Sequence, residues 1–342
     1  MQFIKPNINI DFIGKRKFGY ALSTAFVLLT FLLLIYQGGP RYGIDFSGGT
    51  LIQVKFENQV PLDQIAKGLG NINLDSSATQ QFGDKNENEY LIRTDQFKTN
   101  ANEFTQQIQT ALTSENSGKV EIRRVEAVGA QVGKDLREKA SYAFFYALLF
   151  ITIYISGRFE MKWVLSAVMA FALIGSVYFL SLFDVSIPIL IAVALIVTII
   201  LFWFLKLKYA MGAIVALIHD AIVTVGFFAV FDKEFTLSIV AALLTIVGYS
   251  LNDTIVVFDR VRENLKKQQK YSLDILVNRS INETLARTLL TSGATLIVLF
   301  ALFFFGGAII HDFAFTMIVG IFVGTYSSIF VASPLLLAWR EK

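Results

Sequence analysis

A single carboxylate, Asp253, lies within a long apolar stretch of the sequence. The stretch runs from Phe235 to Phe258, reads FTLSIVAALLTIVGYSLNDTIVVF and is long enough to cross a bilayer as a helix. A charged carboxylate at that depth costs about 2.5–3.5 kcal/mol on insertion scales, so proteins keep one mainly where ions or protons pass. The sequence therefore predicts that Asp253 gains and loses a proton inside the membrane.

Two nearby polar residues are candidates to act with Asp253. Asn252 precedes it, and Arg287 opens the next apolar stretch at about the same predicted depth. An opposite charge beside a carboxylate favours its ionised form, so Arg287 is the expected partner. Two interpretations follow. The pair either only pins two helices together, or it is a proton site in which protonation breaks the pair and lets the helices shift.

A second polar pair, His219 and Asp220, lies near the middle of the apolar stretch that begins at Tyr209. Adjacent residues on a helix point about 100° apart, so these two side chains are not expected to face one another. They either extend a proton path from Asp253 or are satisfied by polar neighbours in the bundle, and the sequence leaves both interpretations open.

Two glycine-rich motifs resemble phosphate-binding loops only in part. Residues 43–49, GIDFSGG, lack the lysine of a P-loop and do not follow a predicted strand. Residues 129–134, GAQVGK, have three residues between the glycines where a P-loop has four. We expect neither motif to bind nucleotide, and we expect both to shape junctions between a domain outside the membrane and the first two spans. The junction residues are Gly43, Asp45, Phe46, Gly48, Gly49, Gly129 and Gly133.

The composition indicates an integral membrane protein. The chain has 342 residues, of which 54% are hydrophobic, and its mean hydropathy is +0.57. It has no cysteine, which excludes disulfides, cysteine-based zinc sites and thiol catalysis. Its two histidines, His219 and His311, stand far apart in the sequence, so no metal site is expected.

Apolar stretches predict about eight membrane-spanning helices. The first, 18–36, follows a basic cluster at 15–17 and lacks a cleavage motif, so we interpret it as an uncleaved span. The others form a bundle of about seven helices within 140–339. They cover Ala140–Ile155, Trp163–Phe183, Val185–Leu205, Tyr209–Phe231, Phe235–Phe258, Thr288–Phe305 and Phe313–Trp339.

The placement of lysine and arginine predicts the orientation of these spans. Residues 1–17 and the loop 259–287 are rich in basic residues, and the latter holds seven of them. Since basic loops stay in the cytoplasm, both termini are expected there and residues 37–139 outside. The charged run Asp259–Lys270 is expected to be a solvated continuation of a span. Gly320 and Gly324 form a small-xxx-small pattern that permits close helix packing.

Residues 37–139 are polar enough to fold in water as a small α+β domain. The expected strands are Gly49–Glu57, Ala78–Phe82, Tyr90–Thr94 and Lys119–Val128, with helices at Pro61–Leu69 and from about Asn100. Glu103 would complete a capping box with Asn100, and Phe104, Ile108 and Leu112 would form one apolar face. The order βαββαβ is that of a ferredoxin-like domain, which binds or supports and shows no catalytic residues.

Several motifs together resemble the SecF proteins of the SecD/SecF family, the smaller of two paired subunits that assist the bacterial Sec export channel. The most specific is residues 248–264, GYSLNDTIVVFDRVREN. The others, in the family's order, are GIDFSGGT (43–50), VGAQVGKDL (128–136), ALIHD (216–220), RTLLTS (287–292) and GTYSSIFVASP (324–334).

The resemblance implies an RND-superfamily membrane protein, multi-pass in the bacterial cytoplasmic (inner) membrane, that uses the proton-motive force to promote protein export. It implies a heterodimer with a SecD-like subunit, contact with the SecYEG channel, YajC, membrane lipid and translocating polypeptide, and no nucleic acid. No cofactor besides the proton gradient and no hydrolytic chemistry are expected. Asp253 and Arg287 fall on the two family positions implicated in proton conduction.

One feature departs from the family, and two other functions compete with export. The family normally has six spans and this sequence predicts about eight, so residues 158–205 are expected to form an extra hairpin.

A proton-driven RND exporter of small molecules or lipids is the first alternative function, although about 100 residues outside the membrane are few for a substrate pocket. The second is a scaffold in which the intramembrane charges only hold helices together.

Overall fold

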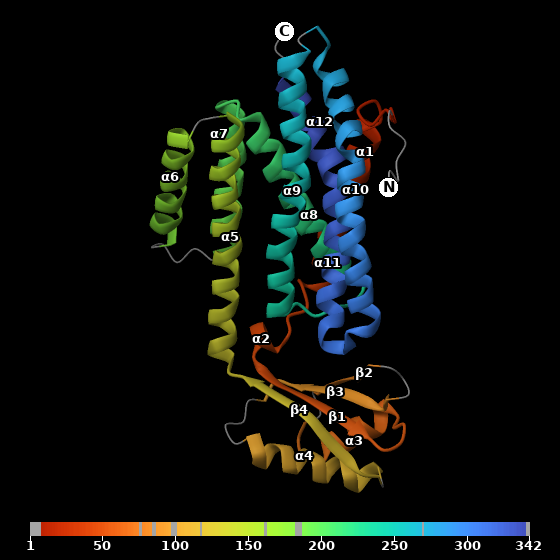
Figure 1. The fold of residues 1–342 in the computed structure, drawn as a ribbon. Helices are drawn as coiled ribbons and strands as arrows, with labels where there is room; N and C mark the ends of the chain where they lie inside the picture. The colour runs from red at the N-terminus through yellow and green to blue at the C-terminus, as the bar shows by residue number, and fades with distance from the viewer. Residues whose placement is uncertain are drawn as a thin grey trace.

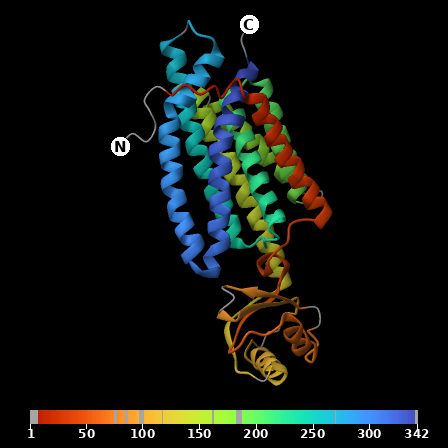
Figure 2. The same cartoon turned by 90° about the vertical axis from the view of Figure 1, so that its right-hand side faces the viewer.

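The protein is a helical bundle with a small α+β domain attached to one end (Figure 1). The structure, a computed structural model, describes residues 8–74, 77–83, 87–96, 101–116, 118–160, 163–181, 187–268 and 270–339. The first and the last of these residues both lie at the end of the bundle opposite the α+β domain (Figure 2). The predicted fold class, a polytopic helical protein with a ferredoxin-like domain, is confirmed.

Within the described residues, six helical segments are long and apolar enough to cross a membrane. Five are single helices, and the sixth, Ile310–Ala338, combines several consecutive helical elements at the end of the chain. The single helices are α1 (Arg16–Gln37), α5 (Ala130–Glu160), α8 (Lys208–Val230), α9 (Leu237–Lys267) and α10 (Leu273–Phe305). The sixth segment consists of α11 (Gly307–Ser327), a π-helical turn η2 (Ser328–Ala332), α12 (Ser333–Leu335) and η3 (Leu336–Trp339).

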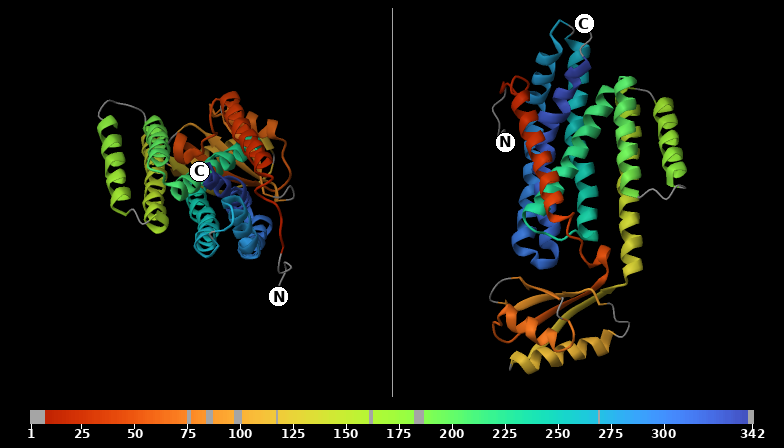
Figure 3. Two further views of the ribbon diagram at one scale, coloured as in Figure 1. Left: turned by 90° about the horizontal axis from the view of Figure 1, so that it is seen from above. Right: turned by 180° about the vertical axis from the view of Figure 1, so that it is seen from behind.

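Two shorter apolar helices, α6 (Trp163–Ser181) and α7 (Ile187–Phe204), occupy the region predicted to be an extra hairpin. They lie beside α5, with α6 outermost (Figure 3). Buried side chains of the three helices form their own apolar cluster, which includes Phe145, Leu173 and Leu190. A buried hydrogen bond from Ser166 to Ser156 also joins α6 to α5. The hairpin is therefore packed on the bundle rather than detached from it.

Glycines allow α11 to lie directly against α9. A Cβ atom at Gly320 would stand 2.2 Å from Ile246 Cδ1, and one at Gly324 would stand 2.8 Å from Ser250 Cβ. Both distances are too short for a carbon contact, so only glycine fits at these two places. The close packing that the small-xxx-small pattern predicts is confirmed, and it brings α11 within reach of the polar side chains of α9.

The α+β domain has the predicted βαββαβ order. Its elements are β1 (Gly49–Phe56), α3 (Leu62–Gly70), β2 (Ala78–Phe82), β3 (Glu89–Thr94), α4 (Ala101–Asn116) and β4 (Val120–Val128). The strands form one antiparallel sheet in the order β2-β3-β1-β4. Along β1, burial alternates with the period of two that a strand covered on one face requires.

Helices α3 and α4 cover the buried face of this sheet. Phe104, Ile108 and Leu112 of α4 are all buried in a core that they share with Ile52 of β1 and Ile65 of α3. The apolar face predicted from their spacing is therefore confirmed. The predicted cap at Asn100 lies outside the described residues.

Helices α9 and α10 extend beyond the apolar part of the bundle. α9 has 31 residues and α10 has 33, which at 1.5 Å per residue exceeds a hydrocarbon core of about 30 Å. As predicted, the charged run after Asp259 continues α9, but the region predicted as a loop to Arg287 is mostly helical, because α10 begins at Leu273. A two-helix extension therefore projects from the bundle.

A carboxylate, Glu283, holds this extension together. It accepts hydrogen bonds from Arg260 at 2.5 Å, Arg279 at 2.8 Å and Asn264 at 2.9 Å. It lies outside the apolar part of α10, which begins after Arg287. Partial burial alone would raise the pKa of Glu283, but the three hydrogen bonds and the charge of Arg260 lower the pKa to about 2.

The segment before α1 is fastened to the same extension by two asparagines. Asn278 accepts hydrogen bonds from the backbone N–H groups of Phe12 and Ile13 at 2.9 and 3.1 Å. Asn278 and Asn282 also donate to the carbonyl of Ile10 at 3.0 and 2.9 Å. Phe12 and Ile13 are buried in the main core, so this contact closes the bundle at the end away from the α+β domain.

A further link, α2 (Ile44–Ser47), connects the bundle to the domain. This short helix lies between the end of α1 and the start of β1, and it packs against the first turns of α5. Figure 1 shows α2 and the projecting end of α5 meeting the sheet at one place. The domain is thus held by two chain segments rather than by one flexible tether.

Candidate functional site

Asp253 lies on α9 in the interior of the bundle, where only 2% of its surface is exposed. The Ser292 hydroxyl of α10 donates a hydrogen bond to Asp253 Oδ2 at 3.3 Å. The Thr325 hydroxyl of α11 lies 2.9 Å from that of Ser292 and also interacts with the carboxyl group. Two helices, α10 and α11, therefore supply hydroxyls to one buried carboxyl group on α9.

Arg287 does not form the predicted ion pair with Asp253. Among the described residues, no cation lies within the 4.0 Å of an ion pair from this carboxylate, and Arg287 is exposed and interacts with it only at longer range. The reason is the rotation of α10. Thr288 and Ser292 are on its buried face, and Arg287 points about 100° away from Thr288. Asn252 likewise lies on the exposed side of α9.

The prediction that His219 and Asp220 would not face each other is wrong. His219 Nδ1 lies 3.0 Å from Asp220 Oδ1, and both residues are buried. Neighbouring Cα atoms are only 3.8 Å apart. Two side chains with rotatable bonds can therefore meet in spite of an angular offset of about 100° between them.

The second oxygen of Asp220 is held by hydroxyls from two other helices. Ser250 of α9 donates to Asp220 Oδ2 at 2.6 Å, and Ser327 of α11 donates to the same atom at 2.8 Å. Polar neighbours thus satisfy Asp220, which was one of the two interpretations left open by the sequence. His219 Nε2, in contrast, is buried and has no hydrogen-bond partner within the described part of the protein.

The two carboxyl groups belong to one buried polar layer that crosses α8, α9, α10 and α11. Ser250 and Asp253 are three residues apart on α9 and so share a face of that helix. Thr325 and Ser327 are close together on α11, and each contacts one of the two acids. We call this set of residues the hydroxyl-carboxyl layer. It comprises Asp220, Ser250, Asp253, Ser292, Thr325 and Ser327.

A π-helical turn directly follows the α11 residues of this layer. η2 begins at Ser328, whose carbonyl accepts a hydrogen bond from the Ser333 hydroxyl at 2.6 Å. Pro334 lacks a backbone N–H and so cannot continue the regular pattern of helical hydrogen bonds. Single π-helical turns inside helices occur often at functional sites. Here the turn lies next to Ser327 and therefore next to Asp220.

Residue-by-residue reasoning missed the partners Ser292, Thr325 and Ser327. A usable signal was present for Ser327, since the small residues Gly320, Gly324 and Ser327 of α11 recur at intervals of four and three and therefore lie on one helix face. Ser292 gave a weaker signal as the end of an RTLLTS motif.

The glycine motif at 43–49 lies where the α+β domain meets the start of α9. Gly43 N–H donates to the carbonyl of Phe235 at 2.9 Å, and Asp45 Oδ2 accepts a hydrogen bond from the backbone N–H of Leu237 at 2.9 Å. Leu237 is the first residue of α9, and Thr236, its N-cap residue, makes no side-chain cap of its own. Asp45 therefore caps the helix that carries Asp253.

The other junction residues pack the domain against α5. Gly48 has a φ of +76°, and a Cβ atom there would stand 2.8 Å from Ala130 Cα. A Cβ atom at Gly133 of α5 would stand 3.0 Å from the backbone nitrogen of Gly48. The backbone N–H of Gly133 donates a hydrogen bond to the carbonyl of Gly129. Phe46 is buried beside Phe235.

Gly49 completes the junction at the edge of the sheet. Its φ of +114° lies in the region that favours glycine. A Cβ atom at this position would also stand only 2.4 Å from the carbonyl oxygen of Thr94, so there is room only for glycine.

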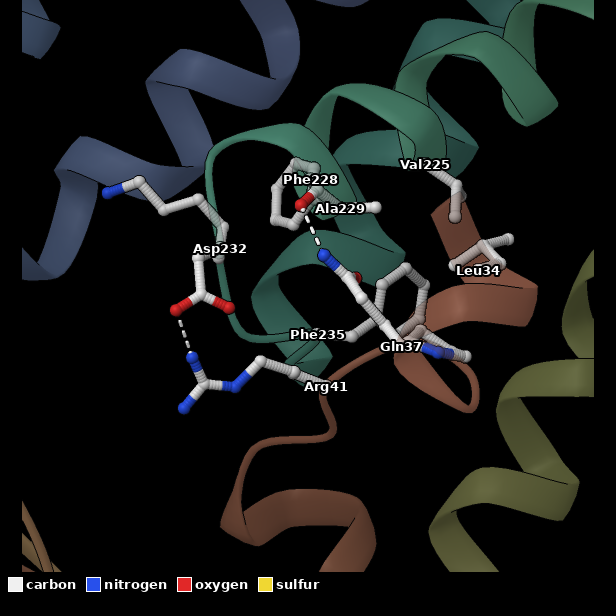
Figure 4. A pocket seen from close by; sticks show the side chains of 10 residues that line it. Leu34, Gln37, Arg41, Val225, Phe228, Ala229, Asp232 and Phe235 are labelled. Carbon is white, nitrogen blue, oxygen red and sulfur yellow. Dashed lines mark hydrogen bonds and ion pairs between the residues drawn. The ribbon is translucent and has the colours of Figure 1, made fainter. Parts of the chain in front are cut away.

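Two ion pairs reinforce this junction at the turn between α8 and α9. Arg93 of β3 donates to Glu234 at 2.8 Å and to the carbonyl of Tyr42 at 2.6 Å. Figure 4 shows the neighbouring contact, in which Arg41 pairs with Asp232 in the turn between α8 and α9. The α+β domain and the segment leading into it are therefore hydrogen-bonded to the residues immediately before α9 by side chains as well as by backbone.

No metal centre accompanies these sites. Within the described residues, no group of three or more histidine and acidic side chains could hold a metal ion.

Comparison with known proteins gives the family of the chain. The sequence profile described as "Protein export membrane protein SecD/SecF, C-terminal" matches residues 107–196 and 174–342. The profile "SecD/SecF GG Motif" matches residues 34–60, which include the glycine motif at the junction. The chain belongs to the SecD/SecF family. The two pieces of the first match overlap at residues 174–196, in the region of α6 and α7.

Similar proteins extend over nearly the whole chain. A protein named "Protein translocase subunit SecF" from Calditerrivibrio nitroreducens is 39% identical over 340 residues, covering 98% of this chain and 96% of its own. One of the same name from Magnetococcus marinus is 41% identical over 345 residues, covering 98% and 94%. With its apolar helices, the protein is therefore a multi-pass membrane protein of the SecF type.

Solved structures share the fold. The crystal structure of SecDF, a translocon-associated membrane protein from Thermus thermophilus, matches with a TM-score of 0.71 and 30% identity over 100% of this chain. SecDF in a super-membrane-facing form matches with a TM-score of 0.56 and 28% identity over 99% of the chain. The chain spans 40% of the length of the first SecDF chain and 39% of the second.

Proposed function

We propose that this protein uses the proton-motive force to promote protein export across the bacterial cytoplasmic membrane, as the SecF-type subunit of a complex with a SecD-like partner. The observation that carries the proposal is Asp253, a carboxyl group buried in a membrane-spanning helix among hydroxyls and without an ion pair to any residue that the structure describes. Such a group is costly to ionise. It is suited to binding a proton and releasing it again.

The hydroxyls beside Asp253 can respond to each protonation step. A hydroxyl has one hydrogen to donate, so when Ser292 donates to the ionised Asp253 it can only accept from Thr325, whose single hydrogen goes either to Ser292 or to the carboxylate. Once the carboxyl group is protonated, it can donate a hydrogen bond to Ser292, and the direction of this hydrogen bond reverses. Protonation therefore changes the hydrogen bonds between α9, α10 and α11.

The energy is sufficient for a domain movement. One proton charge crossing 100 mV releases about 2.3 kcal/mol, so a few protons can bias a two-state equilibrium strongly. No ATP or other cofactor is required in this mechanism, and the protein has no hydrolytic step of its own.

The junction supplies a route from the proton site to the outer domain. Asp253 lies 16 residues, or about 24 Å, after the first residue of α9, which Asp45 caps. A shift of α9 moves Leu237, and the bonds of Asp45 and Arg93 transfer that shift to the sheet. We propose that the outer domain lies outside the membrane, with both termini in the cytoplasm, and acts there on the translocating polypeptide together with the SecYEG channel.

An exposed stripe on α9 supports the heterodimer. Ala241, Thr245, Gly248 and Asn252 are all exposed and recur at intervals of four, three and four residues, so they lie on one face of the helix. Small residues let helices approach closely in a membrane. We propose that the SecD-like partner covers this stripe. Asn252 and the exposed Arg287 then belong to the proton path at the interface between the two subunits.

The test is proton-dependent export after replacement of Asp253 with Asn. We expect the variant to assemble with its partner but to lose the stimulation of secretion by a proton gradient in inverted membrane vesicles. Asp312→Asn is the matched control, because Asp312 pairs with Lys233 away from the hydroxyl-carboxyl layer and should keep the stimulation. Gradient-dependent secretion that is unchanged in Asp253→Asn would refute the proposal and favour a scaffold.

A further inference from the structure

An apolar cavity of about 400 Å³ opens between α5, α7, α8 and α9 at the end of the bundle near the outer domain. Its walls include Phe144, Leu195, Ile218 and Val247 from the four helices. A cavity of this size lies within the range of about 300–1,000 Å³ that is typical of pockets for small organic ligands. Three of the four lining helices, α5, α8 and α9, are long and apolar enough to span a membrane, so we expect lipid rather than water around the cavity.

The cavity continues along α8 toward α1. A second apolar cavity of about 250 Å³ is lined by Thr30 and Leu34 of α1. It shares Phe144, Ala221 and Ile222 with the first one. Together they form an apolar groove that crosses the face of α8, which we call the α8 groove. Its length and its apolar walls suit an extended hydrocarbon chain.

One cation, Arg137, lines the mouth of the groove. It lies on α5 three residues before Ala140, where the apolar part of that helix begins, and therefore at the depth of lipid headgroups. Its guanidinium lies over the Tyr42 ring at 5.5 Å, and within the described part of the chain no carboxylate stands within ion-pair distance. Ser141, one turn further along, also lines the groove.

We propose that the α8 groove binds an anionic phospholipid of the bilayer, with an acyl chain along α8 and the phosphate on Arg137. A guanidinium presents paired N–H donors that fit a phosphate, and Arg137 has no protein anion to compete for them. The cationic Arg137 at the mouth of the groove matches the phosphate of such a lipid, and the apolar walls behind it match the acyl chain.

The groove extends to the junction between the α+β domain and α9. Phe46 and Phe235, which join the outer domain to the start of α9, form part of its lining. A lipid in the groove would therefore contact the residues through which the domain is attached. This inference does not depend on proton coupling, since it concerns only the groove and its cation.

The test is lipid binding to the purified full-length protein, counted by native mass spectrometry in detergent with added phosphatidylglycerol. Diacylglycerol, which has the same chains and no phosphate, is the comparison ligand. We expect the protein to prefer phosphatidylglycerol, and Arg137→Gln to weaken that binding about tenfold or more while leaving diacylglycerol binding unchanged. Ala221→Trp, which fills the groove, should weaken the binding of both.

Matched variants keep the result interpretable. Lys134→Gln removes a nearby exposed cation of α5 that does not line the groove, and it should bind like the unmodified protein. Arg137→Lys should retain part of the preference. The proposal would be overturned if Arg137→Gln bound phosphatidylglycerol as well as the unmodified protein does. It would also be overturned if Lys134→Gln lost as much binding as Arg137→Gln, or if an apolar peptide were retained in the groove in place of lipid.

Discussion

Replacing Asp45 with Ala tests whether the outer domain controls the helix that carries Asp253. Asp45 Oδ2 accepts a hydrogen bond from the backbone N–H of Leu237 at 2.9 Å, and the two residues are 192 positions apart in the sequence. Thr236 makes no side-chain cap, so nothing from its own segment replaces the lost acceptor. We therefore expect the first turn of α9 to open more often in Asp45→Ala than in the unmodified protein.

The size of the effect follows from the free energy of a helix cap. Removing an N-cap acceptor costs about 1 kcal/mol, with a range of about 0.5–2 kcal/mol. This cost raises the equilibrium constant for local opening about fivefold, within about 2- to 30-fold. Hydrogen exchange at the Leu237 amide, which Asp45 protects, should accelerate by the same factor.

The assay is hydrogen exchange measured by mass spectrometry on peptides that cover the start of α9. Asp45→Asn keeps a carbonyl acceptor and should show a smaller increase than Asp45→Ala. Asp63→Ala changes an exposed acid of the same domain, in the first turn of α3, and should leave α9 unchanged. Exchange at Leu237 that stays within twofold of the unmodified protein in Asp45→Ala would refute the reasoning.

Three further predictions concern packing, the N-terminal segment and pH. Gly324→Val forces a side chain into α9 and should cost about 1–3 kcal/mol of stability in a thermal melt, whereas Gly248→Ala, whose added methyl group meets open space, should cost none. Asn278→Ala removes the hydrogen bonds that hold residues 10–13 and should speed their hydrogen exchange by about fivefold or more; unchanged protection would contradict the contact. The pKa of Glu283 is lowered from 4.5 to about 2, so its stabilising contribution is complete above pH 4.5 and is lost as the pH falls toward 2. Glu283→Gln should therefore flatten the pH dependence of the α9–α10 extension in that window, and equal pH profiles of the two proteins would contradict the assignment.

Much of the fold could be predicted because its signals are local. Apolar stretches of sufficient length identify membrane helices whatever surrounds them, since an unpaired backbone cannot remain in lipid. The alternation of residue types along Gly49–Glu57 and the i, i+4 spacing of Phe104 and Ile108 predicted a strand and a helix of the α+β domain in the same way, and the structure has both. Two residues that differ from their surroundings in charge, Asp253 and Asp220, could be selected for the same reason.

The partners of those residues could not be selected from the sequence. Arg287 was expected beside Asp253, yet Ser292 is there, because the rotation of α10 and not the charge of its residues decides which side chain enters the bundle. His219 and Asp220 meet although their helical positions diverge, since side-chain torsions are set by the packing around them.

The sequence alone determined that this protein crosses a membrane, that a ferredoxin-like domain interrupts its spans and that acids are buried within them, because hydrophobicity and periodicity act over a few neighbouring residues. Only the tertiary structure decided that Asp45 caps α9 and that Ser327 reaches Asp220, contacts that span 192 and 107 positions. Such contacts depend on how whole helices rotate and pack. No local pattern specifies that arrangement, since it results from the burial of all the side chains together.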